Sequence, residues 1–548
     1  MRICKSCNAG FEATDSDQRF YKKMDVPEPH YCPACRNQFR LSFRNERALY
    51  KRKCDLSGKS IISFYSPFSP YKVAAQDVWW CDQFDAMSYA RDYDFSRPFF
   101  EQFKDLMKAV PHMAMIVSHG ENSEYCPYSV YYKNSYMCVS GVVGQNIMYS
   151  YWTNDSRDCT DCYACSGCEL CYECVECVSL YNSIFCKDSH HSSNLAFCVD
   201  CDGCKNCIGC FGLKNKEYYV FNQKVTKEEF DRQMAELRSD RGKLNEMMSR
   251  LKAHVLKFPQ RDLHKVNTEN STGDYLINCR NARDCFLSFG LEDCAYCWNI
   301  PQGARDCADI NYSPKAELVY NSMSAVNAYN GICNVFCWDV KDVSYSVESF
   351  YSNDLYGCVG IKRGKYCILN KQYSKEDYFS LRTKIVESMK KAGEWGEFFP
   401  TSLSPFAYNE TIAQDFYPLN REEALARGWQ WTDEELPLPK VEKIIPASRL
   451  PDAVTAIPDD VLNWAIQCEV TDRPFKIISQ ELKFYRTQHL PLPRRHPDQR
   501  YQDRLAWLNP RKLYNRNCDK CQRAIQTTYS PDRPEIVYCE QCNLKEVY

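Results

Sequence analysis

The sequence predicts a mainly β fold with flanking helices, in which two narrow parallel β-solenoid arrays of about 12 residues per coil lie between duplicated modules at the two chain ends. Three observations predict this fold class: a cysteine-rich period of three, a longer period of twelve, and paired CxxC motifs at both ends. The chain has 548 residues. That length is enough for three or four domains.

The period of three is clearest in residues 158–178, DCTDCYACSGCELCYECVECV. From Cys126 to Cys210 every third residue belongs to one register, and apart from Tyr132 its members are small or apolar. A period of three is typical of neither a helix nor a flat strand. We therefore expect this register to face the inside of a tightly wound coil.

The period of twelve lies on top of this register. Positions 126, 138, 150, 162, 174, 186, 198 and 210 are all Cys except Ser150, and an Asn or Asp stands four residues before nearly all of them. Such residues tolerate the left-handed conformation of tight corners. Twelve residues with four inward positions describe a narrow β-solenoid, and the coil pattern resembles that of narrow β-helical antifreeze proteins at the level of fold alone.

A second array repeats the first at an offset of 148, so that residues 159–230 match 307–378 without a gap. Its inward positions take Val, Ala and Leu as readily as Cys. Because packing residues tolerate such exchange and metal ligands do not, we interpret the thiols as small buried hydrophobes. Soft-metal or redox storage remains an alternative. Disulfides fit poorly, since Cys174 would face Leu180 across the coil.

The chain ends carry the strongest chemical motif. Four CxxC knuckles provide two sets of metal-ligand candidates, namely Cys4, Cys7, Cys32 and Cys35 at the N-terminus and Cys518, Cys521, Cys539 and Cys542 at the C-terminus. This spacing indicates two zinc ribbons. Four thiolates leave no open coordination position, so both ions are expected to be structural.

The two ends are also copies of each other. At an offset of 464, residues 4–73 align with 468–537 without a gap, and about a third of the positions are identical. Each copy holds two ribbon units, of which one has lost its ligands: Cys468, Thr471, His496 and Gln499 replace the first set, and Cys54, Ser57, Ala75 and Val78 replace the second. Whether Cys468 and His496 still form half a site stays open.

The N-terminal motif, Cys4-x2-Cys7-x3-Phe11 followed by DQRFYKKMDVPEPHYCPACR, resembles the bacterial "probable zinc-ribbon" modules over roughly the first 40 residues. The whole layout resembles uncharacterised cysteine-rich bacterial proteins that carry such ribbons. The resemblance implies zinc binding and little about biological role.

Charge is distributed unevenly. Residues 1–54 carry 12 Lys/Arg against 6 Asp/Glu (+6), residues 468–548 carry 15 against 10 (+5), and a total of −2 leaves −13 for the middle. Basic ends favour an anionic partner. The nucleic-acid-contact candidates are Arg36, Arg40, Arg44, Arg47, Lys51, Arg52, Lys53, Arg494, Arg495, Arg504, Arg511, Lys512 and Arg516. A solvated helix face is the alternative interpretation.

We expect seven segments: a ribbon pair (1–82), a helical connector (83–121), the first solenoid (122–223), a helix and linker (224–272), the second solenoid (273–372), a helix and extended connector (373–467), and a second ribbon pair (468–548). Thr226 and Ser374 are the expected N-caps of the helices that follow each array, running to about 256 and 391.

The sequence lacks a phosphate-binding glycine loop, a nucleophile elbow and an HExxH motif, so we do not expect an enzyme. The expected function is a zinc-binding scaffold whose basic ends engage a partner, with RNA or DNA as one candidate. The alternatives are a protein-interaction component that docks through its tyrosine-rich solenoid surface, and a thiol-rich reservoir. Without a signal peptide or an apolar span, a cytoplasmic location is expected and a membrane is not.

Overall fold

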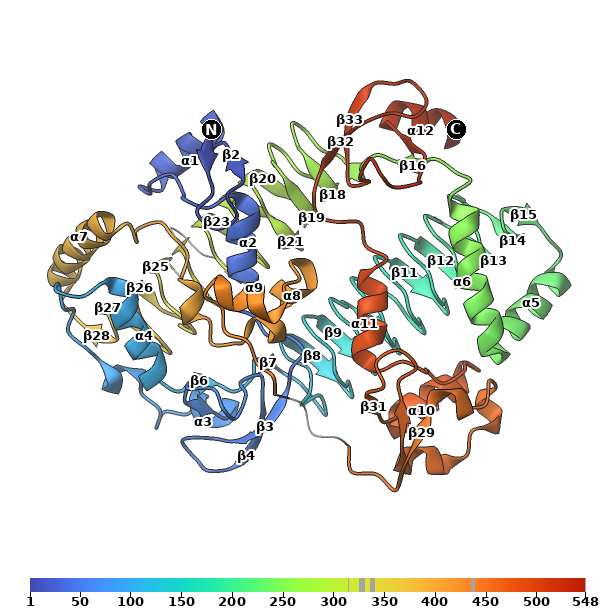
Figure 1. The fold of residues 1–548 in the computed structure, drawn as a ribbon, viewed down its shortest axis with the longest axis horizontal. Coiled ribbons are helices and arrows are strands. Elements are labelled where there is room, and N and C mark those ends of the chain that lie inside the picture. Colours follow the sequence, from blue (N-terminus) through green and yellow to red (C-terminus); the bar gives the residue numbers. More distant parts are fainter. Residues whose placement is uncertain (314, 325–330, 336–340, 435–438, 548) are drawn as a thin grey trace.

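The computed structural model describes residues 1–313, 315–324, 331–335, 341–434 and 439–547. Within these ranges the fold is mixed α/β, with 12 α-helices and many sheets built from parallel strands (Figure 1). The mainly β class expected from the sequence is therefore too narrow, because helices and irregular segments make up a whole layer of the molecule.

The first array is a stack of parallel strands joined at a spacing of twelve residues. Val130 pairs with Val142, and Ser193 pairs with Lys205. The strands are β7 (Val117–Ser118), β8 (Ser129–Lys133), β9 (Val142–Gln145), β10 (Ser156–Arg157), β11 (Val178–Tyr181), β12 (His190–Ala196), β13 (Lys205–Ile208), β14 (Glu217–Val220) and β15 (Gln223–Lys224). Only β15 is antiparallel to its neighbour, and it ends the array.

The chain winds because its corners suit the left-handed conformation. Asn134, Asn182 and Asn194 have φ of 48°, 48° and 54°. Asn182 also donates a side-chain hydrogen bond of 2.8 Å to Asn194 in the next winding. Asparagine adopts this backbone region at little cost. The expected corner role of the Asx positions is thus present in the structure.

The inside of each winding is closed to water. Every cysteine from Cys126 to Cys210 is buried. The thiols donate to backbone carbonyls: Cys174 Sγ lies 3.6 Å from the Tyr172 oxygen and 3.5 Å from the Ser183 oxygen. A buried thiol with such acceptors is satisfied in its protonated form.

The second array has the same spacing, except that β17 and β18 pair at an offset of eleven residues and β20 and β22 at an offset of thirteen. Its strands are β17 (Lys265–Val266), β18 (Gly273–Ile277), β19 (Cys285–Phe289), β20 (Leu291–Ala295), β21 (Trp298–Ile300), β22 (Ala304–Ala308), β23 (Ala316–Tyr320), β24 (Gly331–Ile332), β25 (Lys341–Ser344), β26 (Asn353–Tyr356), β27 (Lys365–Ile368) and β28 (Lys371–Gln372). The expected inward positions 325, 328, 337 and 340 lie outside the described residues.

Helices follow both arrays, as the caps predicted. The single helix expected after Thr226 is two, α5 (Lys227–Ser239) and α6 (Arg241–Val255), because Asp240 ends the first and caps the second. Ser374 caps α7 (Lys375–Ala392), which ends at the left-handed Gly393. The helix before the first array is α4 (Phe99–Ala109).

The segment expected to be an extended connector is packed instead. Trp395, Phe399 and Tyr408 are at most 4% exposed and belong to the largest apolar core. It contains the short helices α8 (Ile412–Phe416) and α9 (Arg421–Ala426). Its aromatic side chains fill the space between the N-terminal module and the second array, which local composition did not reveal.

The terminal modules contain short strands and helices. The N-terminal module holds β1 (Arg2–Ile3), β2 (Gly10–Phe11), α1 (Asp15–Lys23), α2 (Pro33–Leu41), β3 (Tyr50–Lys53), β4 (Ser60–Ser63), β5 (Val73–Ala74) and α3 (Gln76–Trp80). The C-terminal module holds β31 (Pro474–Phe475), α10 (Ser479–Thr487), α11 (Pro497–Leu505), β32 (Tyr514–Asn517), β33 (Ala524–Thr527), β34 (Val537–Tyr538) and α12 (Glu540–Val547). The remaining strands are β6 (His112–Met113), β16 (Gln260–Arg261), β29 (Lys443–Pro446) and β30 (Trp464–Gln467).

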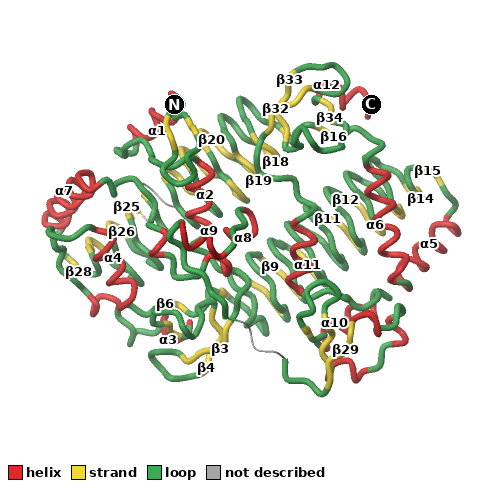
Figure 2. The backbone as a smooth tube through the Cα atoms, viewed as in Figure 1, coloured by secondary structure: helices red, strands yellow, loops and turns green. Residues whose placement is uncertain are grey.

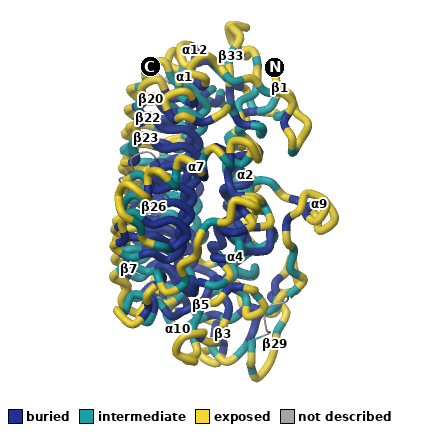
Figure 3. Tube along the Cα trace, turned by 90° about the vertical axis from the view of Figure 1, so that its left-hand side faces the viewer, coloured by how far each residue is buried: buried dark blue, intermediate teal, exposed yellow. Residues whose placement is uncertain are grey.

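The two arrays lie side by side and form one layer, and the terminal modules and connectors form a second layer on one face of it (Figures 2 and 3). Stacked rings of Trp152 and Tyr312, 4.3 Å apart, join the arrays. So does a hydrogen bond of 2.8 Å from Tyr275 to Asp188. In the part of the chain that is described, no helix combines the length and apolar character needed to cross a bilayer.

Candidate metal centres

The N-terminal cysteines form a compact cluster. The Sγ atoms of Cys4, Cys7, Cys32 and Cys35 all lie within 4.8 Å of one another. The Cys7 and Cys32 sulfurs are 3.7 Å apart. A tetrahedral zinc with bonds of about 2.3 Å requires sulfurs about 3.8 Å apart. The four side chains therefore fit a closed tetrahedral metal ion.

The C-terminal cluster has the same geometry. Cys518, Cys521, Cys539 and Cys542 place their sulfurs within 4.8 Å of one another, and the Cys521 and Cys539 sulfurs are 3.7 Å apart. Burial by itself raises the pKa of Cys518, but hydrogen bonds from the backbone amides of Cys521 and Cys539 outweigh this effect and lower the pKa to about 6. In the N-terminal cluster, a hydrogen bond with Cys35 lowers the pKa of Cys32 to about 5. Each cluster thus holds a thiolate that is ready to bind a cation.

The first knuckle has the same turn in all four ribbon-like units, whether or not the unit keeps its ligands. The amide of Asn8 donates to the Cys4 carbonyl over 3.0 Å, and the same bond joins Gly58 to Cys54, Asp472 to Cys468 and Gln522 to Cys518. These four donors all have positive φ. The turn therefore survives in the two units that have lost their ligands, and Cys54 still accepts amide hydrogen bonds of 3.3 Å from Ser57 and Ala75.

Two arginines of the N-terminal module face the second array. Arg36 and Arg40 lie on α2 and are at most 2% exposed. Arg36 Nε lies 2.5 Å from Asp309 Oδ2, and Arg40 Nη1 lies 3.7 Å from Asp309 Oδ1. Arg40 also donates to Asn311 and Asn321. Arg36, Arg40, Arg44 and Arg47 recur at a spacing that would place them on one helix face, but α2 ends at Leu41 and contains only the first two.

The C-terminal module makes the same contact with the first array. Arg500 and Arg504 on α11 both pair with the fully buried Asp161, with 2.9 Å between Arg504 Nη1 and Asp161 Oδ1. Arg500 is Arg36 shifted by 464 residues, and Asp161 is Asp309 shifted by 148. The duplication of the chain ends and the duplication of the arrays have different offsets, yet together they reproduce the same ion pair.

Other contacts repeat under the same two offsets. Tyr21 packs on Tyr320 with ring centroids 5.7 Å apart, and Tyr485 packs on Tyr172 at 5.6 Å. Val73 pairs with His112, and Val537 pairs with Gln260. Each terminal module thus docks its first cysteine unit on one array and its second unit at the start of the other. The molecule has a pseudo-twofold arrangement.

The other candidate arginines also have partners within the chain, whereas the candidate lysines are at the surface. Arg44 pairs with Glu46 at 2.6 Å, and Arg47 pairs with Asp498 at 2.6 Å and lies over the Tyr501 ring. Further contacts join Arg52 to Asp55, Arg494 to Asp452, Arg495 to Glu469 and Asp503, Arg511 to the Trp298 and Phe416 rings, and Arg516 to Asp519. Lys51, Lys53 and Lys512 are exposed.

The residues that sequence reasoning missed are Asp161 and Asp309. Both stand outside the inward register of the arrays and belong to no motif. The two aspartates correspond to each other at the offset of 148, and Arg36 and Arg500 correspond at the offset of 464. This double correspondence is the signal that could have paired each aspartate with its arginine. The outward Tyr163 and Tyr172 are covered as well, because the C-terminal module packs on them, whereas Tyr181 is 47% exposed.

The array thiols form no comparable centre. Among the described residues, two groups place three or more ligand atoms within 4.8 Å of one another, and both are the terminal clusters.

No family model matches this chain, and no curated protein matches it. The zinc-ribbon resemblance therefore rests on the cysteine clusters alone. A solved structure from Desulfovibrio desulfuricans G20, described as a "putative acetyltransferase", matches at 10% identity and a TM-score of 0.11, over 57% of this chain and 89% of that one. A likeness this weak carries no argument about the chemistry of the present protein.

One expectation from the sequence is corrected here. The prediction that the chain is not an enzyme is withdrawn: it rested only on the absence of three sequence motifs, and the solved structure above is described as an enzyme. The terminal clusters can hold metal ions such as zinc, and metal binding is the property that the geometry of these sites supports.

Proposed function

We propose that the protein is a zinc-binding scaffold in which two zinc ribbons are docked on two narrow β-solenoids. The observation that carries the proposal is the geometry of the two four-cysteine clusters, whose sulfur spacing suits a tetrahedral zinc ion. Each ion would tie together two knuckles that are otherwise joined by short strands, turns and, in the N-terminal module, helix α1. Zinc is thereby expected to hold each ribbon in the shape that docks.

The arrays serve as the rigid part of the scaffold. Their cysteines serve as small packing residues, because the thiols donate to backbone carbonyls and because Val, Ala and Leu take the corresponding positions in the second array. This favours the scaffold over the thiol reservoir. Parallel windings also present flat outer faces, with Tyr131, Val143 and Val178 between 37% and 54% exposed on the first array.

The docking of the ends favours a protein partner over a nucleic acid. The arginines at positions 36, 40, 44, 500 and 504 are at most 3% exposed and face carboxylates of the same chain. The basic ends therefore neutralise the acidic body. Specific protein partners use exposed aromatic and apolar surface of the kind that the arrays present.

Chelation followed by limited proteolysis tests the proposal. Removing zinc from the native protein is expected to expose residues 1–41 and 514–547 to cleavage while the arrays stay intact, and zinc is expected to restore protection. Equal cleavage with and without the chelator would contradict it. Salt-dependent binding of RNA or DNA that is lost when Lys51, Lys53 and Lys512 are changed to Gln would instead support the nucleic-acid alternative.

A further inference from the structure

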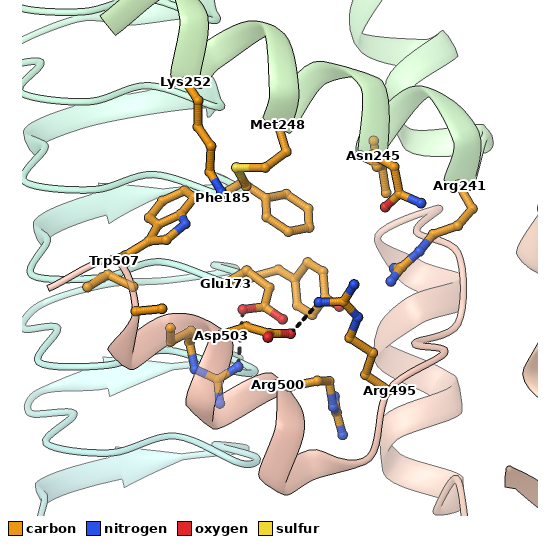
Figure 4. Close-up of a pocket in the computed structure, with 15 residues that line it drawn as sticks. Glu173, Phe185, Arg241, Asn245, Met248, Lys252, Arg495, Arg500, Asp503 and Trp507 are labelled. Atoms are coloured by element: carbon orange, nitrogen blue, oxygen red, sulfur yellow. Dashed lines mark hydrogen bonds and ion pairs between the residues drawn. The ribbon is translucent and has the colours of Figure 1, made fainter. Parts of the chain in front are cut away.

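A cavity of about 560 Å³ lies between the first array, α6 and the C-terminal module, and the docking contacts leave it unfilled (Figure 4). Its size falls within the usual range for small-molecule sites. The array contributes Tyr172, Glu173 and Phe185, while Trp507 follows α11. The cavity is thus walled by three parts of the chain that meet only in the folded protein.

Helix α6 lines the cavity with one stripe of side chains. Arg241, Asn245, Met248 and Lys252 recur at spacings of four, three and four, so they share a face of the helix. Among the described residues no ion pair is recorded for Arg241 or Lys252, and the buried Arg241 Nε has no hydrogen-bond partner. This face therefore presents cationic groups whose charge the protein does not neutralise by direct contact.

The carboxylates on the opposite wall of the cavity are already paired with arginines of the same chain. Asp503 accepts from Arg495 over 2.7 Å, and Glu173 accepts from Arg504 over 3.1 Å. Figure 4 shows the Arg241 and Arg495 side chains extending toward each other from opposite sides. Two guanidinium groups facing one space, with one of them unpaired, form a place for an anion.

The rest of the wall is apolar. Phe185, Met248 and Trp507 gather at the end where the Lys252 side chain reaches in (Figure 4). In a second cavity, of about 430 Å³ beside α7, Lys390 is paired with Asp25 at 3.1 Å, but Arg382 forms no ion pair among the described residues and its Nε has no hydrogen-bond partner. An unpaired cation is thus common to both cavities, and the first differs in being lined by several arginines where the second has Arg382 alone.

We propose that this cavity binds a small organic anion with a flat apolar body, with the anionic group between Arg241 and Arg495 and the body against Phe185, Met248 and Trp507. An aromatic monophosphate combines both features, and adenosine monophosphate is a suitable probe of this class.

Calorimetric titration of the full, metal-loaded chain tests the proposal. Adenosine monophosphate is expected to bind more tightly than adenosine, which lacks the charge, and than inorganic phosphate, which lacks the body. Arg241→Gln is expected to weaken binding about 10- to 100-fold, the usual effect of losing a charged hydrogen bond. Arg250→Gln is the matched control, because Arg250 lies on the same helix outside the cavity and pairs with Glu246.

Met248→Trp provides a second variant, which fills the apolar end and leaves every charge in place. It is expected to abolish binding of adenosine monophosphate without lowering the midpoint of thermal unfolding by more than a few degrees. Absence of binding to the native protein, or equal affinities in the Arg241→Gln and Arg250→Gln proteins, would overturn the proposal.

Discussion

The guanidinium of Arg36 is buried against the carboxylate of Asp309, with 2.5 Å between Nε and Oδ2. The pair joins the N-terminal module to the second array across 273 residues of sequence. Its copy, Arg500 with Asp161, joins the C-terminal module to the first array. The basic ends and the acidic body of the chain are thus two halves of one intramolecular interface.

Arg36→Gln is expected to destabilise the docked module strongly. Removing one partner of a buried pair leaves the other charge uncompensated, at a cost of about 3–5 kcal/mol. The measurement is the urea midpoint for release of the N-terminal module. Arg97→Gln is the control, because Arg97 pairs with Asp105 at the surface with both side chains more than 40% exposed, and such pairs contribute under about 1 kcal/mol. Equal effects of the two changes would argue against a docking role for Arg36.

The core cysteines are expected to behave as packing residues. Cys174→Ala should lower the free energy of unfolding by about 1–2 kcal/mol, because it removes one buried heavy atom from a closed winding. Its metal content should equal that of the native protein. Thermal unfolding and metal analysis of the same sample check both points, and a loss of bound metal would favour the reservoir alternative instead.

A pH dependence is expected from His264 and Asp274, whose Nδ1 and Oδ1 atoms are 3.2 Å apart. Burial lowers the pKa of His264, but Asp274 raises it more, to about 9. Burial raises the pKa of Asp274, but His264 lowers it below its usual value. The histidine contribution is therefore complete below about pH 6.5 and is lost as the pH rises through about 9. The aspartate contribution is lost as the pH falls through its depressed pKa.

Comparing His264→Gln with the native protein between pH 6 and pH 10 checks this dependence. The difference in thermal midpoint should be largest near pH 6 and should shrink toward pH 10. A difference that stays constant across this range would show that the ion pair does not carry the effect. His254→Gln serves as a control, because burial lowers the pKa of His254 and no carboxylate pairs with it among the described residues.

The local rules of the fold were visible in the sequence. The period of three marks the buried thiols, the Asx positions mark left-handed corners, and the CxxC motifs mark both cysteine clusters. Each of these features repeats along the chain and depends on nearby residues alone. Thr226 and Ser374 likewise cap helices as expected.

Long-range docking was not visible. Nothing local distinguishes Asp161 from an outward, solvated aspartate, and the burial of Arg36 depends on a segment nearly 300 residues away. For the same reason the connector around Tyr408 was expected to be extended, although its aromatic rings are buried against distant elements. Tertiary contact overrode composition at these positions.

The two units without complete ligand sets are expected to bind no metal. Cys54→Ser and Cys468→Ser should leave the zinc content unchanged, because each cysteine stands in a knuckle whose other ligand positions are occupied by residues such as Ser57 and Thr471. Metal analysis after gel filtration is the measurement. A loss of one equivalent in Cys468→Ser would reveal a partial site with His496.

The metal content of the purified native protein tests the central claim most directly. The account predicts two zinc ions per chain, falling to one in Cys32→Ser and to one in Cys539→Ser, with no change in the core variant Cys162→Ser. A native protein with no zinc, or one that carries many soft metal ions and loses them in the Cys162→Ser variant, would contradict it.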